Sequence, residues 1–263
     1  MTDSLMQQIR DYAVPKKSVG IWWLGQSGYI FKTPEGTLVG VDLYLTNSCG
    51  PAYPELNLER QVPVLIEPEE LRVDVFACTH NHLDHTDPET IRGLREKDRM
   101  QFVGPAPSCE VFRKEGVEPG RIVPAWPDCE IGLRDVTTRG TFALPTDATD
   151  LNHMGFVFEF GSGPRVYVTG DTDFHELLYS AGKHKPDLVI TVINGGFNNL
   201  SHWEAAELVR AIRPKAAIPC HYDMFADNAV DPRQFQVSLK LRCPDVRYVQ
   251  MEHGKPLVFE KGR

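Results

Sequence analysis

The segment CTHNHLDHTD, at residues 78–87, carries the residues best suited to chemistry in this sequence. It brings together His80, His82, Asp84 and His85. In an extended chain residues i and i+2 point the same way, so His80 and His82 can bind one ion, while Asp84 and His85 can reach a second. Imidazole and carboxylate groups suit zinc, manganese or iron. The segment therefore predicts a metal site, with a solvated loop or a helix-capping cluster as the alternative.

Three further candidate ligands lie where β-rich runs begin or end. Asp171 follows one such run, His221 ends another in IPCH, and His153 comes just before a third. Taken singly, Asp171 fits a turn or a helix N-cap, and a lone His221 fits a structural role. Together with the 80–85 segment, they supply the convergence that a metal site assembled on a sheet requires. A site with two ions needs a bridging carboxylate, and Asp171 is the natural candidate.

The elements that must position these side chains are short strands with helices between them. Residues 1–17 predict a short helical arm and residues 18–263 a single domain. The runs that predict strands are 19–25, 28–33, 37–45, 72–80, 101–105, 130–138, 155–160, 165–170, 187–193 and 215–221. Helices are predicted at 87–97, 107–116, 173–181 and 201–212. The last helix has a capping box formed by Ser201 and Glu204.

The order of these elements favours an α/β fold with two sheets packed face to face and helices outside. The first three strands lack crossover helices, and no G-x-G-x-x-G motif follows a strand, so a Rossmann fold is a weaker match. The two last runs, 246–251 and 255–260, are expected to pair with each other around EHGK.

The composition is that of a mildly acidic globular chain. The 263 residues carry a formal net charge of −8 and no basic stripe, which argues against nucleic-acid binding. No apolar run reaches the length of a signal-peptide core or a membrane span. The six cysteines contain no C-x-x-C pair, so we expect them to be reduced and mostly buried. These features predict a cytoplasmic protein that binds neither nucleic acid nor membrane, and they leave a homo-oligomer open.

The motif THNHLDH resembles the H-x-H-x-D-H signature of the metallo-β-lactamase superfamily. His153, Asp171 and His221 follow in the order of that superfamily's remaining ligand motifs. Within it, WWLGQSGYIF, VGVDLYL and IPCHYDMF resemble the ascorbate-6-phosphate lactonase family. The resemblance covers nearly the whole chain. It implies a four-layer αββα sandwich and a cytosolic, metal-dependent lactone hydrolase.

The same resemblance implies two divalent ions, zinc or manganese, that share Asp171. The residues implied for the first ion are His80, His82 and His153, and those for the second are Asp84, His85 and His221. Asp150 or Asn152 is the alternative to His153. Asp42, at the end of VGVD, matches an early buried aspartate that would orient a ligand histidine, although a turn residue fits it nearly as well.

The implied reaction is the opening of a sugar lactone or phospholactone by metal-bound hydroxide. A bound metal lowers the pKa of water to about 7. Asp84 would orient the water or accept its proton. The expected partner is a small molecule, and the resemblance implies a phosphorylated sugar lactone. The residues predicted to contact it are Arg139, Asn194, His202 and Tyr222, although His202 also fits a solvated first turn.

Three other functions remain open from the sequence. A phosphodiesterase for small molecules could use the same two ions. A redox di-iron protein of this fold would resemble H-x-E-x-D-H, but His82 stands where the glutamate would be. A binding protein could keep the metal without turnover. A serine hydrolase has no support, because the chain contains no G-x-S-x-G elbow.

Overall fold

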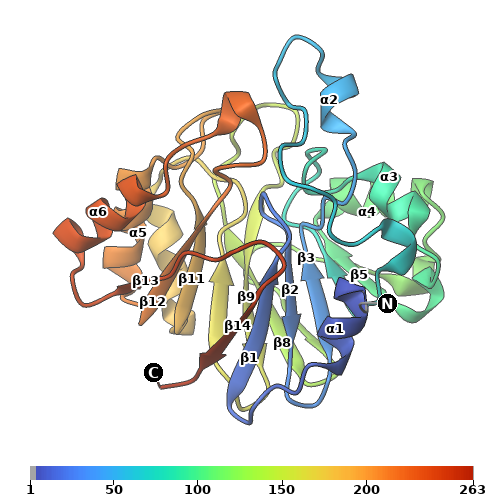
Figure 1. The fold of residues 1–263 in the computed structure, drawn as a ribbon, viewed down its shortest axis with the longest axis horizontal. Helices are drawn as coiled ribbons and strands as arrows, with labels where there is room; N and C mark the ends of the chain where they lie inside the picture. The colour runs from blue at the N-terminus through green and yellow to red at the C-terminus, as the bar shows by residue number, and fades with distance from the viewer. Residues whose placement is uncertain (1–3, 263) are drawn as a thin grey trace.

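The computed structural model describes residues 4–262, whose strands form two seven-stranded sheets (Figure 1). The first sheet has the order β14-β1-β2-β3-β4-β5-β6 and the second β13-β12-β11-β10-β9-β8-β7. The two sheets lie between two groups of helices, with α3 and α4 on one flank and α5 and α6 on the other (Figure 1). This is the αββα sandwich that the sequence predicts.

The bounds of the elements are as follows. The first sheet consists of β1 (Ser18–Trp23), β2 (Tyr29–Lys32), β3 (Leu38–Val41), β4 (Val75–Ala77), β5 (Gln101–Gly104), β6 (Ile122–Pro124) and β14 (Pro256–Glu260). The second consists of β7 (Glu130–Leu133), β8 (Val136–Phe142), β9 (Met154–Phe160), β10 (Arg165–Val168), β11 (Leu188–Val192), β12 (Ala216–Cys220) and β13 (Arg247–Tyr248). The α-helices are α1 (Leu5–Asp11), α2 (Cys49–Ala52), α3 (Pro88–Gly93), α4 (Ala106–Lys114), α5 (His202–Ile212) and α6 (Arg233–Arg242). The longest 3₁₀ segment is η4 (Glu176–His184).

Both faces of the first sheet are buried, because its strands carry apolar residues at consecutive positions. In β1, Ile21 and Trp23 belong to the core shared by the two sheets, whereas Trp22 belongs to an outer core. The shared core includes Phe31 and Phe158, whose ring centroids lie 5.8 Å apart across the sheets. Successive side chains of a strand point to opposite faces, so an unbroken apolar run is typical of a strand covered on both sides.

A buried lysine holds the N-terminal helix against the first sheet. Lys32 of β2 donates from Nζ to the main-chain oxygens of Ile9, Arg10 and Tyr12. These carbonyls lie at the C-terminal end of α1, where a helix leaves its last carbonyls without internal partners. The predicted helical arm thus contains the short helix α1, which ends at Asp11, and β1 begins at Ser18 after an irregular segment.

Several sequence predictions are confirmed in detail. Ser201 and Glu204 form the expected capping box at the start of α5. All six cysteines are free, and only Cys243 is not fully buried. Over residues 4–262, every helix falls short of the length and apolar character that crossing a membrane requires.

Three predictions about elements are wrong. The run 130–138 is a tight hairpin, β7 and β8, that turns at Arg134 with φ 55°. The helix predicted at 173–181 is the 3₁₀ segment η4, and its N-cap is His175 rather than Asp171. The last two runs do not pair with each other. Instead β13 extends the second sheet beside β12, and β14 completes the edge of the first sheet beside β1.

Candidate metal centre

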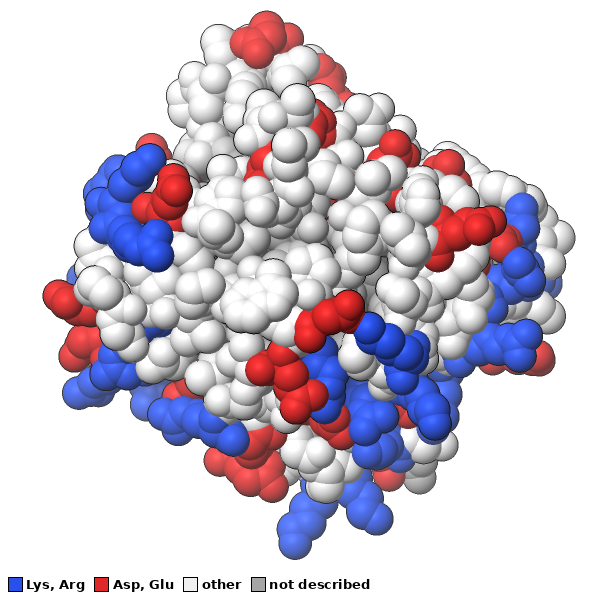
Figure 2. Space-filling model, turned by 180° about the vertical axis from the view of Figure 1, so that it is seen from behind, with Lys and Arg blue, Asp and Glu red and all other residues white. Residues whose placement is uncertain are grey.

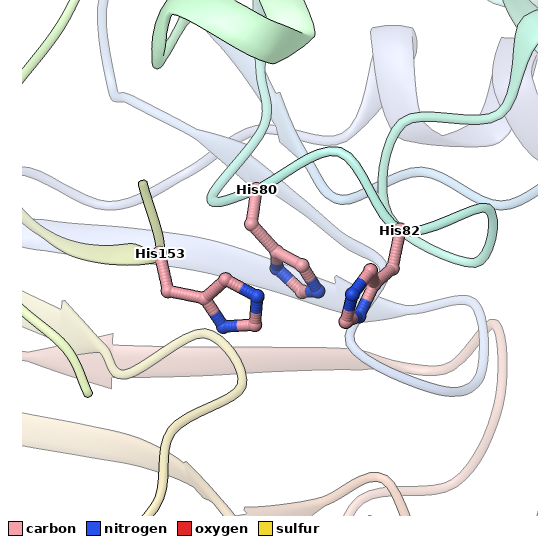
Figure 3. A group of neighbouring side chains, drawn as sticks. All are labelled: His80, His82 and His153. Carbon is pink, nitrogen blue, oxygen red and sulfur yellow. The ribbon is translucent and has the colours of Figure 1, made fainter. Parts of the chain in front are cut away.

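Three imidazoles converge beyond the end of β4 (Figure 3). His80 and His82 follow β4, and His153 directly precedes β9. The ring centroid of His80 lies 4.0 Å from that of His153 and 4.5 Å from that of His82. Each ring offers one nitrogen, and these three nitrogens lie within 4.8 Å of one another. This is the set that the resemblance implies for the first ion.

Neighbouring groups fix which ring nitrogen is available in His80 and His153. His80 Nδ1 lies 3.1 Å from the hydroxyl of Thr79, which itself donates to Asp42. His153 Nδ1 lies 3.1 Å from the main-chain oxygen of Asp171, an acceptor only. Both Nδ1 atoms are therefore donors, and both Nε2 atoms are buried without a hydrogen-bond partner. Burial lowers the pKa of both rings, which favours the neutral form that binds metals.

The ring of His82 is oriented through contacts at Nε2, whereas those of His80 and His153 are oriented through Nδ1. Its Nε2 lies 3.1 Å from Thr149 Oγ1 and 3.3 Å from a carboxylate oxygen of Asp147. Nδ1 is then the ring nitrogen that remains for an ion. A ligand histidine commonly uses its second nitrogen in this way, because the outer contact fixes the ring.

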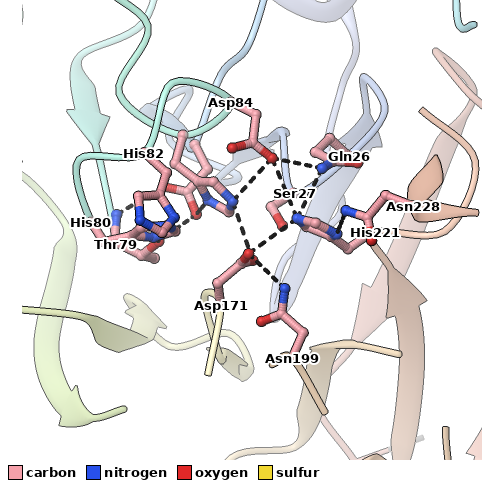
Figure 4. Close-up of polar contacts among 12 residues, drawn as sticks. Gln26, Ser27, Thr79, His80, His82, Asp84, Asp171, Asn199, His221 and Asn228 are labelled. Atoms are coloured by element: carbon pink, nitrogen blue, oxygen red, sulfur yellow. Dashed lines mark hydrogen bonds and ion pairs between the residues drawn. The ribbon is translucent and has the colours of Figure 1, made fainter. Parts of the chain in front are cut away.

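A second group of candidate ligands, around Asp171, lies beside the first (Figure 4). Asp171 Oδ1 lies 3.2 Å from His85 Nε2, and Asp171 Oδ2 lies 3.2 Å from His221 Nε2. Asp84 Oδ2 lies 3.5 Å and 3.4 Å from the same two nitrogens. The two imidazoles and two carboxylates thus face one another around a small space, and His80, His85 and Asp171 form an overlapping group.

The pKa values of these groups are coupled through short contacts. Burial alone would lower the pKa of His85, but the carboxylates of Asp171, Asp84 and Asp42 raise it well above its ordinary value. Against the same effect of burial, Asp171 raises the pKa of His221 to about 9. Burial opposes ionisation of Asp171, yet His221 and His85 hold its pKa well below the usual range. A divalent cation bound here would take the place of the protons that the carboxylates otherwise hold on His85 and His221.

Asp42 has the position that its predicted orienting role requires. Its carboxylate accepts from the main-chain N–H and the hydroxyl of Thr79, both at 2.8 Å. It also lies 3.0 Å from His85 Nδ1. One carboxylate thus orients His85 directly and His80 through Thr79. Asp42 adopts φ 47°, a conformation rare outside glycine, asparagine and aspartate.

Gln26 is a site residue that the sequence did not reveal. It is buried in the turn between β1 and β2, at φ 51°. Its Nε2 lies 2.6 Å from Asp84 Oδ2 and 2.8 Å from His221 Nε2. Its main-chain oxygen accepts from the indole N–H of Trp23 and the main-chain N–H of His221. The motif LGQSG signals a turn, but nothing local in it indicates which long-range partner the glutamine meets.

Two asparagines were also missed. Asn199 donates to Asp171 Oδ2 at 2.8 Å, and Asn228 contacts Nδ1 of His221 at 3.1 Å. Of the alternatives to His153, Asp150 accepts from the main-chain N–H groups of Asn81 and Asn152. Its carboxylate therefore supports the loop, whereas His153 faces the other imidazoles (Figure 3).

The four residues predicted to contact substrate lie elsewhere. Arg139 forms ion pairs with two glutamates on neighbouring strands, and His202 contacts Ser238 of α6. Tyr222 is buried against Trp23. Asn194 donates to Asn228 and so lies one contact behind His221. None of the four belongs to the lining of the pocket described next.

A cavity of about 230 Å³ opens onto the ligand groups. Its polar lining residues are His82, Asp84, Thr146, Asp147, Thr149, Asp171, Asn199, His221 and Asn228. Its other lining residues are Cys49, Tyr53, Leu56, Leu58, Leu83, Phe197 and Phe225. A cavity of this size suits a small molecule.

Comparisons with known proteins agree with this geometry. A family model described as "Beta-lactamase superfamily domain" matches residues 48–222, which include all seven candidate ligands. A UPF0173 metal-dependent hydrolase from Polynucleobacter asymbioticus is 26% identical over 256 residues, covering 90% of this chain and 85% of the relative. Another, from Thermoplasma acidophilum, is 31% identical over 173 residues, covering 65% of this chain and 75% of the relative.

The fold has close counterparts among solved structures. Igni18, a novel metallo hydrolase from Ignicoccus hospitalis, superposes with a TM-score of 0.72 at 19% identity. The match covers 92% of this chain and 99% of that protein. At this identity the likeness concerns the fold alone.

Proposed function

Since the chain belongs to the beta-lactamase superfamily and is a metal-dependent hydrolase related to the UPF0173 proteins, we propose that it hydrolyses a carboxylic ester or lactone of a small molecule. The observation that carries the proposal is that Asp171 contacts His85 and His221, forms one ligand group with His80 and His85, and lines a cavity together with His82 and Asp84. Two adjacent cation sites of this kind suit the attack of water on a polarised carbonyl.

The imidazole nitrogens and carboxylate oxygens of these residues are of the types that hold divalent ions. His80, His82 and His153 would hold one, and Asp84, His85 and His221 the other, with Asp171 between them. When bound, zinc or manganese ions would lower the pKa of water and polarise the substrate carbonyl.

Asp84 is the residue best placed to handle a proton. Its side chain lines the cavity, and its Oδ2 accepts a hydrogen bond from Gln26. Burial favours its neutral form, but His85 and His221 hold the pKa of Asp84 below its usual range. An ionised carboxylate at this position can orient the attacking water and accept its proton.

The first experiment is metal analysis of the purified protein together with a substrate panel of lactones, aryl esters and bis(4-nitrophenyl) phosphate. We expect about two ions per chain and turnover of esters or lactones. Asp171→Ala should lose metal and activity, whereas Asp173→Asn, a change two residues away, should keep both. One ion per chain or none, or an active Asp171→Ala variant, contradicts the two-ion proposal. Turnover of the phosphodiester alone would replace it with a phosphodiesterase.

The phosphorylated sugar lactone implied by the sequence resemblance is not part of this proposal. The resemblance to the ascorbate-6-phosphate lactonases remains a prediction, as does the cytoplasmic location. The side chains that this protein offers to a substrate are those that line its cavity.

A further inference from the structure

The outer wall of the cavity is apolar and aromatic. It is formed by Tyr53, Leu56 and Leu58 from the segment after α2, and by Phe197 and Phe225 from two later loops. Tyr53 and Phe197 remain 40% and 48% exposed. Large rings exposed beside a cavity are unlike scattered surface apolar residues, because a ligand can bury them.

Phe197 is held in place by a strained backbone. It adopts φ 53°, and Asn198 follows at φ 57°. For a bulky residue a positive φ is a genuine outlier, and such strain persists only where the surroundings enforce it. Here Asn198 donates to the main-chain oxygen of Thr146, and Asn199 donates to Asp171. The same loop therefore fixes both a ligand carboxylate and an aromatic ring at the mouth of the cavity.

The cavity offers no cationic side chain to an anionic substrate. None of its lining residues, within the described range 4–262, is lysine or arginine, while Asp84, Asp147 and Asp171 all line it. The arginine of the adjacent loop, Arg60, is turned inward and donates to the main-chain oxygens of Tyr44, Val62 and Leu24. A charged group without a partner is costly to bury.

At the end of the molecule where α2 lies, the surface seen in Figure 2 also carries few lysine and arginine side chains. Figure 2 shows the back of the molecule with Lys and Arg mostly in its lower half, interleaved with Asp and Glu. Its upper end, the end at which α2 lies in Figure 1, is mostly white and red. A phosphate group outside the ion positions would therefore meet rings and carboxylates.

We infer that the substrate is an uncharged molecule whose apolar part lies against Tyr53, Phe197 and Phe225, with the reacting carbonyl toward Asp171. The position of the reacting carbonyl in this inference rests on the proposed function. The position of the apolar part of the substrate rests only on the residues that form the cavity wall. It makes Phe197 a specificity-determining residue, and it replaces the phosphorylated sugar with a neutral, apolar ester or lactone as the expected substrate class.

The turnover test uses the metal-loaded protein and three 4-nitrophenyl esters that differ at the acyl end: acetate, hexanoate and the anionic hemisuccinate. We expect kcat/KM for hexanoate to be about tenfold above that for acetate, because the longer chain buries apolar surface. Hemisuccinate should fall at least tenfold below hexanoate. Phe197→Asn keeps a residue that tolerates positive φ and should bring the ratio of kcat/KM for hexanoate to that for acetate close to one.

The matched control is Trp126→Ala, which removes an aromatic ring that is 60% exposed and outside the cavity lining. It should alter none of the three rates. Equal or faster turnover of hemisuccinate overturns the inference. So does a Phe197→Asn variant that slows acetate and hexanoate by the same factor.

A binding test separates this inference from the proposed function. Hexanamide and succinamate are titrated into the metal-loaded protein and its Phe197→Asn variant by calorimetry. Hexanamide binding weakened about tenfold by Phe197→Asn supports the apolar wall even if no ester is hydrolysed, in which case the proposed function alone fails. Ester turnover with hexanamide binding that is the same in both proteins means that the inference fails and the proposed function stands.

Discussion

Single residues in this site act through contacts between segments that are far apart in the sequence. Asp42 illustrates this, since its carboxylate contacts Thr79 and His85 and so orients two candidate ligands from behind. Asp42→Asn should weaken metal binding about 10–100-fold, because residues that orient ligand histidines have effects of this size. Competition with a chromophoric chelator measures it. The control is Asp187→Asn, in a carboxylate that supports the start of β10; tight metal binding in Asp42→Asn would contradict the orienting role.

Gln26 is expected to act on the rate rather than on substrate binding. It is a positioning residue, because its amide contacts Asp84 and His221 and does not line the cavity. Gln26→Asn tolerates the positive φ but is one methylene too short to hold Asp84. We expect kcat to fall about tenfold or more with KM nearly unchanged, since the proton acceptor loses its orientation. A change in KM alone would indicate a different role, and metal content measured in parallel shows whether the ions are retained.

The sequence revealed the ligands of the centre better than their surroundings. His80 to His85 stand out because their spacing is tied to one local turn. Gln26, Asn199 and Asn228 are ordinary polar residues in loops, and their partners lie 195, 28 and 7 positions away along the chain. The packing of the two sheets brings Gln26 to His221, and the folding of irregular loops brings the two asparagines to their partners, so residue types and local spacing could not identify them.

At the scale of elements, the strands around Arg139 are joined by ion pairs. Glu159 of β9 pairs with Arg139 of β8 and Arg165 of β10, each at 2.8 Å. Hydrogen bonds from Arg165 and Arg139 hold the pKa of Glu159 below its usual value, although burial acts against this. A carboxylate with a lowered folded-state pKa contributes stability above its unfolded pKa, and this contribution is lost as the pH falls through the folded value.

Glu159→Gln should therefore lower the free energy of unfolding by about 1 kcal/mol at pH 7, the size expected for partly exposed pairs. The difference from the wild type should shrink as the pH falls below about 4, where Glu159 is increasingly protonated in both states. Denaturant unfolding at several pH values measures it. Arg139→Gln should show a similar loss with kcat unchanged; a large fall in kcat would instead support the contact with substrate that the sequence predicted.

The elements that the sequence predicted least well are those whose partner is not their neighbour. Residues 246–251 and 255–260 look like a hairpin because a turn motif separates two β-rich runs. The two runs nevertheless join different sheets: β13 pairs with β12 in the second sheet, and β14 pairs with β1 in the first. Pairing of distant edges depends on the whole topology, whereas the β1–β2 and β9–β10 hairpins join runs that are neighbours in the sequence.

For the molecule as a whole, the centre lies where the two sheets meet, with Asp42 from one sheet and Asp171 from the other. Ions bound there should stabilise the folded state, because a ligand at 100 times its Kd contributes about 2.7 kcal/mol. For a chain of this size we expect Tm to fall by roughly 5–10 °C on metal removal, since 1 kcal/mol corresponds to about 2–4 °C. Differential scanning calorimetry with and without a chelator checks this. Asp171→Ala should be insensitive to the chelator, and an equal shift in that variant would place the stabilising ion elsewhere.

The pairing of β14 with β1 also has a consequence for synthesis of the chain. On the ribosome, β1 emerges early, but the strand that covers its open edge is residues 256–260. Until then the nascent first sheet presents unpaired main-chain groups along β1, which is the kind of edge to which other chains add. This edge therefore stays open until residues 256–260 have been translated, and nonsense mutations that stop the chain just before β14 should yield chains that aggregate during expression although every candidate ligand is present.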